Sequence, residues 1–295
     1  MELRTLGYFV AVAEEESFSR AAERCRVAQP AVSQQIRSLE RELGEQLFER
    51  RPRSVVLTPA GRVLMPYARD ALAAVASAKA EFAAREGVLT GDLTLGSVDG
   101  VEITPLPRML GTFRSRYPDV TVRLVGGTSS ALLDQVRHGA LDAAAIAHPL
   151  QPLEDSLGHR TLLRDEIVAV VRRDRREARQ TSITLQELAG TALISYGPDN
   201  GLHPAIDEAF RRADLRFAPA YATNDVALLV ALAVEGVGIA VAAGADPEVH
   251  LDPRVIAVPV TPRIPYRKVL VWRRVPAPAA PLRALLALSE PYLAE

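Results

Sequence analysis

Apolar residues recur at the spacing of amphipathic helices through the first part of the chain. The first set, which predicts a helix ending at the acidic run 14–16, is Leu3, Leu6, Phe9, Val10 and Ala13. A short second helix is expected near residues 19–26, where Ser19 fits the N-cap because its hydroxyl can accept from a backbone N–H. The third set is Val32, Ile36, Leu39 and Leu43. These sets predict three short helices around a shared core.

The third helix carries its own start and stop signals. Pro30 suits the first helical position, where its missing N–H costs no hydrogen bond, and Gly44 suits the end. Beyond it, Phe48 and the run 55–57 predict two short strands around an arginine-rich turn. Three helices followed by a small hairpin predict a winged helix-turn-helix over residues 1–58.

A long helix is expected next, from Pro59 to about Glu86, with Thr58 as its cap. Its apolar residues, which follow a heptad-like order, are Leu64, Ala68, Ala71, Val75, Ala78 and Phe82. The pattern fits a helix packed on its own domain, or a linker that pairs with a second copy. We favour a dimerising linker over residues 59–90, because the helix separates two differently built regions.

From residue 91 the pattern changes to alternating strands and helices, which predicts a parallel sheet covered by helices. Strands are expected over 92–98, 120–127, 141–148, 165–174, 191–196, 219–224, 238–243 and 267–274. Helices are expected over 104–117, 129–139, 185–190, 201–214, 226–236 and from about 280. The alternation restarts midway, so residues 91–295 predict two lobes with a cleft between them. Lobe I takes about 91–162 and 268–295, and lobe II about 163–267.

Composition and charge narrow the class of protein. The chain has 48% hydrophobic and 24% charged residues, as expected of globular material, and a net charge of −1. It is therefore not basic throughout, although local basic patches are compatible with that sum. The single cysteine, Cys25, excludes an internal disulfide. We find neither a signal peptide nor an apolar run long enough to cross a membrane, and we expect a cytoplasmic protein without a membrane partner.

The polar face of the third helix has the residue types that read DNA. In a helix-turn-helix the second helix of the motif lies in the major groove and presents its N-terminal turns to base edges. Glutamine suits adenine, arginine suits guanine, and basic residues at a wing tip suit phosphate or a narrow minor groove. The expected DNA-binding residues are Ser19, Gln29, Pro30, Ser33, Gln34, Arg37, Arg50, Arg51 and Arg53. The carboxylates of Glu40 and Glu42 cannot lie near DNA phosphates, so only the first two turns of the helix should enter the groove.

Three segments, "SFSRAAERC", "QPAVSQQIRSLERELG" and "LFER…LTPAG", give residues 6–61 a strong resemblance to the DNA-binding domain of LysR-type transcriptional regulators. Weaker matches, "LDAAAIA" and "VALLVALAVEGVGIAV", fall in the later region. The resemblance implies an α+β multi-domain chain with a winged helix-turn-helix, a linker helix and a two-lobed effector domain like that of periplasmic binding proteins. The implied partners are double-stranded promoter DNA, a small-molecule effector, further copies in a homodimer or homotetramer, and RNA polymerase.

One residue departs from the resemblance. Such regulators usually carry an aliphatic residue where this chain has Cys25. A small core side chain is the first interpretation. A redox-sensing thiol is the alternative, although the chain offers no second cysteine to pair with it.

The expected effector site lies where strands end and helices begin, because ligands of two-lobed α/β domains bind there. Its predicted residues are Ser97, Asp99, Thr128, Ser129, His148, Asn200, Gly201, Leu202 and Asn224. The resemblance places Ser97, Thr128 and the loop 200–202 at the effector, and a carboxylate is the expected ligand group. Thr128 and Ser129 would equally serve as helix caps, and 200–201 as a turn. Asp99 is poorly suited to an anion and would instead accept from a hydroxyl or an amine.

No catalytic or cofactor motif accompanies this pattern. The histidines, His138, His148, His159, His203 and His250, lack metal-ligand spacing. There is no phosphate loop or nucleophile elbow, so we expect no enzyme activity and no cofactor. A ligand-responsive transcription factor is the prediction. A solute-binding protein or an enzyme that uses the two-lobed region is the alternative.

Overall fold

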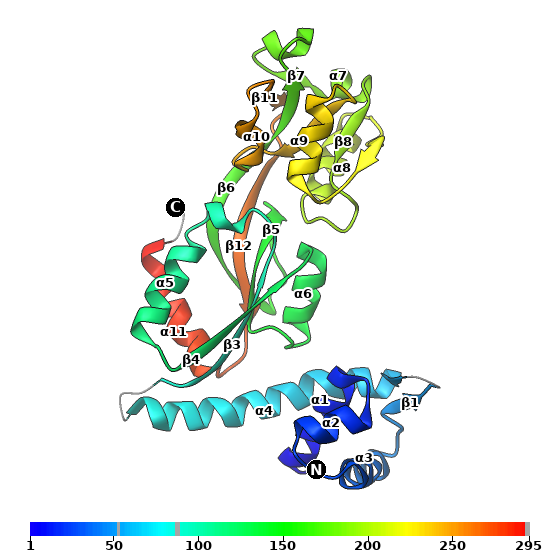
Figure 1. Cartoon of the computed structure of the whole chain (residues 1–295), viewed down its shortest axis with the longest axis vertical. Helices are drawn as coiled ribbons and strands as arrows, with labels where there is room; N and C mark the ends of the chain where they lie inside the picture. The colour runs from blue at the N-terminus through cyan, green and yellow to red at the C-terminus, as the bar shows by residue number, and fades with distance from the viewer. Residues whose placement is uncertain (52–53, 86–88, 293–295) are drawn as a thin grey trace. The chain divides into compact units, whose positions relative to one another are not determined.

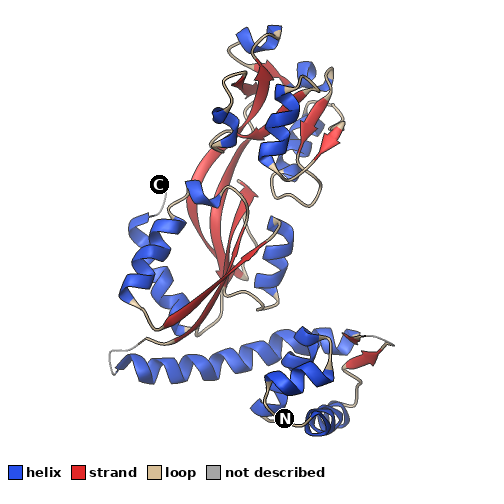
Figure 2. Cartoon of the chain, in the orientation of Figure 1, coloured by secondary structure: helices blue, strands red, loops and turns tan. Residues whose placement is uncertain are grey.

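The computed structural model of the chain describes residues 1–51, 54–85 and 89–292 and forms two compact units (Figure 1). The first is built mainly from residues 1–91 and the second mainly from residues 92–292. Helices dominate the first unit, whereas the second combines helices with a large sheet (Figure 2). The expected division into residues 1–58, 59–90 and 91–295 remains a prediction.

The first unit has the expected order of elements. Its elements are α1 (Leu3–Glu15), α2 (Phe18–Arg24), α3 (Gln29–Leu43), β1 (Phe48–Arg50), β2 (Val55–Leu57) and α4 (Pro59–Arg85). Strands β1 and β2 pair antiparallel as the hairpin of the wing. Gly44 ends α3 with φ +74°, a left-handed conformation that glycine adopts without a steric penalty. Thr58 accepts from the Gly61 N–H at 3.0 Å and caps α4.

Three expectations about helix starts and faces are wrong. The N-cap of α2 is Ser17, whose hydroxyl accepts from the Arg20 N–H at 3.4 Å, because the helix starts one residue before Ser19. Gln29 opens α3, so Pro30 is the second helical residue. Leu43 is 42% exposed, since the last turn of α3 extends past the core that buries Val32, Ile36 and Leu39.

The apolar residues of α4 divide between two environments. Ala68 is buried in the core of the first unit, and Leu64 and Ala71 pack against that core. In contrast, Phe82 is 66% exposed. The expected continuous seam is therefore wrong for the first half of the helix, which packs on its own domain.

The second unit contains a mixed sheet. Within residues 89–292 its strands are β3 (Gly91–Ser97), β4 (Val120–Gly126), β5 (Ala143–Pro149), β6 (Leu157–Arg172), β7 (Ile183–Thr184), β8 (Leu193–Ser195), β9 (Tyr221–Ala222), β10 (Ile239–Ala243), β11 (Val255–Thr261) and β12 (Pro265–Arg273). Its helices there are α5 (Leu106–Arg116), α6 (Ser129–Arg137), α7 (Leu185–Ala189), α8 (His203–Arg212), α9 (Val226–Val234), α10 (Glu248–Leu251) and α11 (Ala280–Ser289). Short 3-10 helices cover Val101–Ile103, Arg176–Arg179 and Glu290–Tyr292.

The sheet has the order β4-β3-β5-β12-β6-β10-β8-β9, and β11 joins β6 to β7. Strands β3 and β5 are parallel, but β12 is antiparallel to both β5 and β6. The expectation of a purely parallel sheet is therefore wrong, because β12 returns from late in the chain to fill the space between β5 and β6.

Strand β6 connects two lobes of this unit. Residues 157–166 pair with β12, and residues 167–172 pair with β10 and β11. We call the part with β3, β4, β5, β12, α5, α6 and α11 lobe I, and the part with β7–β11 and α7–α10 lobe II (Figure 1). The first half of β6, together with β7, β11 and α10, was not expected from the sequence pattern.

Candidate functional site

The first two turns of α3 expose most of the residues expected to bind DNA. Gln29, Pro30, Gln34 and Arg37 are all exposed. The side chain of Arg37 bends back along the helix, where its Nε donates to the Ser33 carbonyl at 3.2 Å. The helix start therefore presents two amides and a guanidinium on one solvent-facing surface.

Ser33 departs from this surface. Its side chain is only 4% exposed, and its hydroxyl accepts from Gln29 Nε2 at 2.7 Å. The expectation that Ser33 faces solvent is wrong, because its position lies one residue after Val32, on the edge of the buried stripe. Ser33 instead holds the side chain of Gln29.

The wing residues are described only in part. Arg51 is exposed and its Nε donates to Glu49 Oε1 at 3.4 Å, whereas Arg50 is the last residue of β1. Arg53 lies outside the described residues. Ser19 is exposed on α2, and its contact with DNA stays a prediction.

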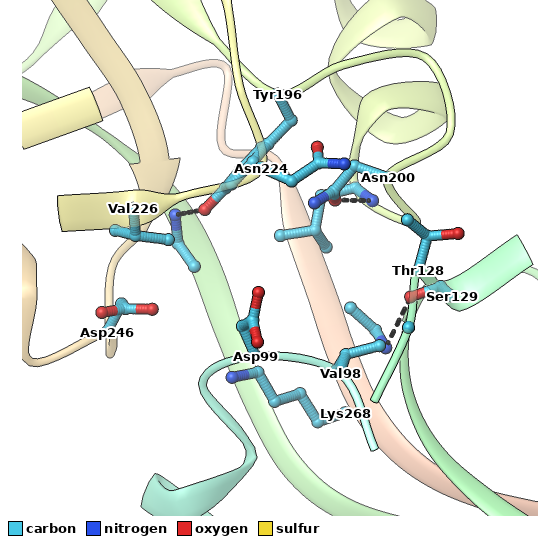
Figure 3. A pocket seen from close by; sticks show the side chains of 14 residues that line it. Val98, Asp99, Thr128, Ser129, Tyr196, Asn200, Asn224, Val226, Asp246 and Lys268 are labelled. Carbon is cyan, nitrogen blue, oxygen red and sulfur yellow. Dashed lines mark hydrogen bonds between the residues drawn. The ribbon is translucent and has the colours of Figure 1, made fainter. Parts of the chain in front are cut away.

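A cavity of about 250 Å³, lined by both polar and apolar residues, lies between the two lobes of the second unit (Figure 3). Its lining residues are Val98, Asp99, Gly127, Thr128, Ser129, Ala147, Tyr196, Asn200, Leu202, Asn224, Val226, Ala243, Asp246 and Lys268. The predicted residues that the fold brings together here are Asp99, Thr128, Ser129, Asn200, Leu202 and Asn224.

The lobe I wall is the start of α6. Thr128 Oγ1 accepts from the Ala131 N–H at 3.4 Å, which is a cap, and Ser129 Oγ accepts from the Ala147 N–H at 3.2 Å. The Ser129 hydroxyl retains a proton that can be donated into the cavity, whereas Thr128 Oγ1 donates to Ser130 Oγ at 3.3 Å. The N-terminus of α6 adds a partial positive charge, so this wall suits a negatively charged group.

The lobe II wall is built from amides that fix its loops. Asn200 Oδ1 accepts from the Leu202 N–H at 2.9 Å, and Asn224 Oδ1 accepts from the Gly197 N–H at 3.2 Å. Ser130 Oγ donates to the Asp199 carbonyl at 3.0 Å, which connects the two walls. The cavity is therefore enclosed by both lobes and depends on how they are placed.

Three charged groups, Lys268, Asp246 and Asp99, form the remaining side of the cavity (Figure 3). Lys268 is 3% exposed and donates to the Gly100 carbonyl. Gly100 has φ +69°, and a Cβ there would lie 2.5 Å from Lys268 Nζ, so the approach requires glycine. Burial lowers the pKa of Lys268 and raises the pKa of Asp246, while the charge of each opposes the shift of the other.

The sequence pattern missed the buried charges Lys268 and Asp246, although one signal was present. Lysine occurs only at Lys79 and Lys268, and Lys268 stands within the apolar run of β12. A lysine in a buried strand requires a partner, because an unpaired buried charge is costly. Asp246 gave no comparable signal.

Three predicted site residues lie outside the cavity lining. Ser97 Oγ donates to the Val98 carbonyl at 3.2 Å, and His148 Nδ1 bonds the Pro149 carbonyl at 2.7 Å. Gly201 packs against lobe I, where a Cβ would lie 2.3 Å from the Ala147 carbonyl oxygen. Ser97 and His148 use these polar atoms locally and Gly201 supplies space, so their role at the ligand stays a prediction.

Within the described ranges no group of histidine, cysteine and carboxylate side chains could hold a metal ion. A search of the same residues found no helix with the length and apolar character needed to cross a membrane. Cys25 is half-buried beside the core of the first unit.

Two family models match the chain. Residues 3–62 match the bacterial regulatory helix-turn-helix protein, lysR family, and residues 86–293 match the LysR substrate binding domain. The Hca operon transcriptional activator HcaR of Escherichia coli is 34% identical over 245 residues, covering 82% of this chain and 80% of HcaR. The regulator ShiR of Corynebacterium glutamicum is also 34% identical, covering 82% of both chains.

Solved structures agree with this match. Full-length OxyR from Pseudomonas aeruginosa superposes with a TM-score of 0.78 at 25% identity, covering 99% of this chain and 94% of OxyR. CbnR in complex with its target DNA has the same fold, with a TM-score of 0.62 at 22% identity, covering 99% of this chain and all of CbnR. The chain belongs to the LysR family of transcriptional regulators. It is thus a ligand-responsive regulator of transcription, with a DNA-binding helix-turn-helix and a substrate-binding domain.

Proposed function

We propose that the chain binds promoter DNA through the first two turns of α3 and senses a small polar metabolite in the interlobe cavity. The proposed metabolite site rests on one observation: the buried Lys268 lies beside Asp246 and Asp99, opposite the start of α6 (Figure 3). The family match supports a role on DNA in the cytoplasm without catalysis.

The residues around the cavity favour two different chemical groups on one ligand. The Ser129 hydroxyl and the positive end of α6 favour a carboxylate beside Thr128 and Ser129. Asp99 and Asp246 accept hydrogen bonds and repel anions, so they favour a hydroxyl or an amine. A small carboxylate that carries a hydroxyl or amine at its other end satisfies both walls.

A ligand in this cavity contacts both lobes, so it binds best at one lobe angle. Binding then shifts an existing equilibrium between lobe arrangements and does not create DNA binding from nothing. We propose that the response passes to the promoter through a dimer or tetramer, and to RNA polymerase where transcription is activated.

Thermal unfolding of the full chain tests the ligand class with three matched probes. Pentanoate, 5-hydroxypentanoate and 5-aminopentanoate share a carboxylate and differ only at the far end. The two substituted acids should raise the unfolding midpoint more than pentanoate. Asp246→Asn should remove that difference, and Thr128→Val should weaken all three responses.

Asp207→Asn is the matched control, because Asp207 is exposed on α8 and absent from the cavity lining. It should respond as the unaltered chain does. A carboxylate and its far-end donor should each change the affinity about tenfold. Equal shifts of the unfolding midpoint for the three acids would therefore contradict the proposed ligand class. No shift with any of them at about 10 mM would contradict it as well.

A further inference from the structure

Arginine and histidine side chains line one face of the lobe I sheet. Arg267 on β12 stands in register with His148 on β5 and with Arg164 on β6. Residues in register on antiparallel strands project from the same face, and like charges in that position destabilise a sheet. This row therefore places the charge of Arg267 beside that of a second arginine, Arg164.

Arg267 is buried without a carboxylate partner among the described residues. Its side chain is 9% exposed, its Nη1 donates to His159 Nε2 at 3.2 Å, and its Nη2 donates to the Gln151 carbonyl at 2.9 Å. Its Nε is fully buried and has no hydrogen-bond partner. Burying a cation that is paired only with neutral acceptors destabilises the fold, because its charge is removed from water without compensation.

The neighbouring histidines are neutral as they stand. Because arginine only donates, His159 Nε2 must accept, which leaves the ring proton on Nδ1. His148 Nδ1 donates to the Pro149 carbonyl. Burial, followed by the positive charge of Arg267, lowers the pKa of His159, and burial likewise lowers the pKa of His148.

The charged groups that act on these side chains are all basic. Arg267 acts on both histidines, Arg274 and His148 act on His159, and Arg164 acts on Arg267. An anion placed among them would neutralise Arg267 and would allow the histidines to take up protons and donate to it.

We propose that Arg267, His159 and His148 form a second ligand site that binds a small oxyanion. The site is distinct from the effector cavity, because Arg267 and Lys268 are consecutive residues of β12 and project from opposite faces of the sheet. The cavity holds two carboxylates, whereas the charged groups that act on this face are basic, so an inorganic oxyanion such as sulfate or phosphate prefers this face.

Sulfate is the first probe, because it keeps its double charge across the pH range used. Thermal unfolding of the full chain is followed in bis-tris chloride, with sodium chloride at matched ionic strength as the reference. Sulfate at ten times its dissociation constant should raise the midpoint by about 3–6 °C. Phosphate and acetate, added in parallel, separate a tetrahedral inorganic ion from a simple carboxylate.

Arg267→Met keeps the length of the side chain and removes the charge. Without sulfate its midpoint should equal or exceed that of the unaltered chain, since a buried unpaired charge is lost. Its affinity for sulfate should fall about tenfold or more, as expected for a lost charge-assisted hydrogen bond. Arg263→Met is the matched control, because Arg263 is exposed and pairs with Glu166.

The pH dependence supplies a second, independent readout. Sulfate should bind more tightly as the pH falls from 7.5 to 5.5, because the histidines gain protons in the bound state. His159→Gln should reduce the rise in sulfate affinity at low pH. This variant tests the site by itself if Arg267→Met does not fold. The proposal is overturned if sulfate does not stabilise the chain, or if Arg267→Met or His159→Gln responds as Arg263→Met does.

Discussion

Gly201 shows how one missing side chain sets the distance between two lobes. It lies in the loop before α8, and a Cβ there would meet the Ala147 carbonyl oxygen at 2.3 Å and Ser129 Oγ at 2.5 Å. Both neighbours belong to lobe I, so only glycine allows this loop to close over the start of α6. Lys268 and Arg267 show that position also decides the role of a charged residue. They are adjacent in the sequence, but their side chains lie on opposite faces of the sheet.

Gly201→Ala should lower the unfolding midpoint of the full chain, because the added methyl group forces the loop away from lobe I. Overpacking of this kind costs about 1–3 kcal/mol, or roughly 2–4 °C for each kcal/mol in a unit of this size. Differential scanning fluorimetry measures the change.

Gly111→Ala is the matched control in the same unit. Gly111 lies inside α5 with no atom within 4 Å of the added Cβ, so alanine should leave the midpoint unchanged or raise it. If Gly201→Ala behaves like Gly111→Ala, the loop does not depend on this close approach.

At the scale of elements, α3 combines two tasks in one helix. Val32, Ile36 and Leu39 are buried, while Gln34 and Arg37 remain exposed on the other side. Glu40 accepts from the Leu47 N–H at 2.9 Å, so this carboxylate turns toward the chain that follows the helix. The first turns are thereby left as the surface free of negative charge.

Gln34→Ala and Arg37→Ala should each weaken binding to the specific promoter and reduce discrimination between sequences. A bidentate contact to a base edge is worth about 1–3 kcal/mol. Gel retardation with promoter DNA and with a scrambled duplex, at several salt concentrations, measures both effects.

Arg216→Ala is the control, since Arg216 is exposed in the other unit. It should leave the ratio of specific to non-specific affinity unchanged. If Gln34→Ala and Arg37→Ala also leave the ratio of specific to non-specific affinity unchanged, these residues do not contact base edges in the groove.

Local sequence signals located most elements but not their partners. Amphipathic spacing and caps placed α1, α3 and α4, because those signals depend on neighbours in the sequence. The cap of α2 was misplaced by two residues, and β11 was missed. The mixed sheet order could not be derived from alternation, since β12 pairs with strands more than a hundred residues earlier.

At the scale of the whole molecule, α4 carries exposed apolar side chains as well as buried ones. The predicted seam is interrupted, because Ala68 packs inside its own unit, yet Val63 and Tyr67 are 66% and 68% exposed on the same helix. Large apolar side chains that are exposed together indicate a contact surface. We therefore expect self-association through the face that carries Val63, Tyr67 and Phe82.

Tyr67→Glu combined with Val63→Glu should reduce the mass of the assembly, because two charges would be buried at the contact. Sedimentation velocity at micromolar concentration measures it. Arg62→Glu, at an exposed neighbouring position, is the control for added charge and should matter less. An unchanged mass in the double variant would exclude this face as the contact.

The sequence by itself determined the helix-turn-helix, the long helix and the family, because periodicity, caps and motifs act over a few residues. It also identified six of the residues around the cavity, since strand ends and helix starts are local features. Only the tertiary structure decided that Lys268 faces Asp246 while Arg267 meets His159. Burial depends on which distant strands flank β12, and a charged side chain changes its chemistry with those neighbours.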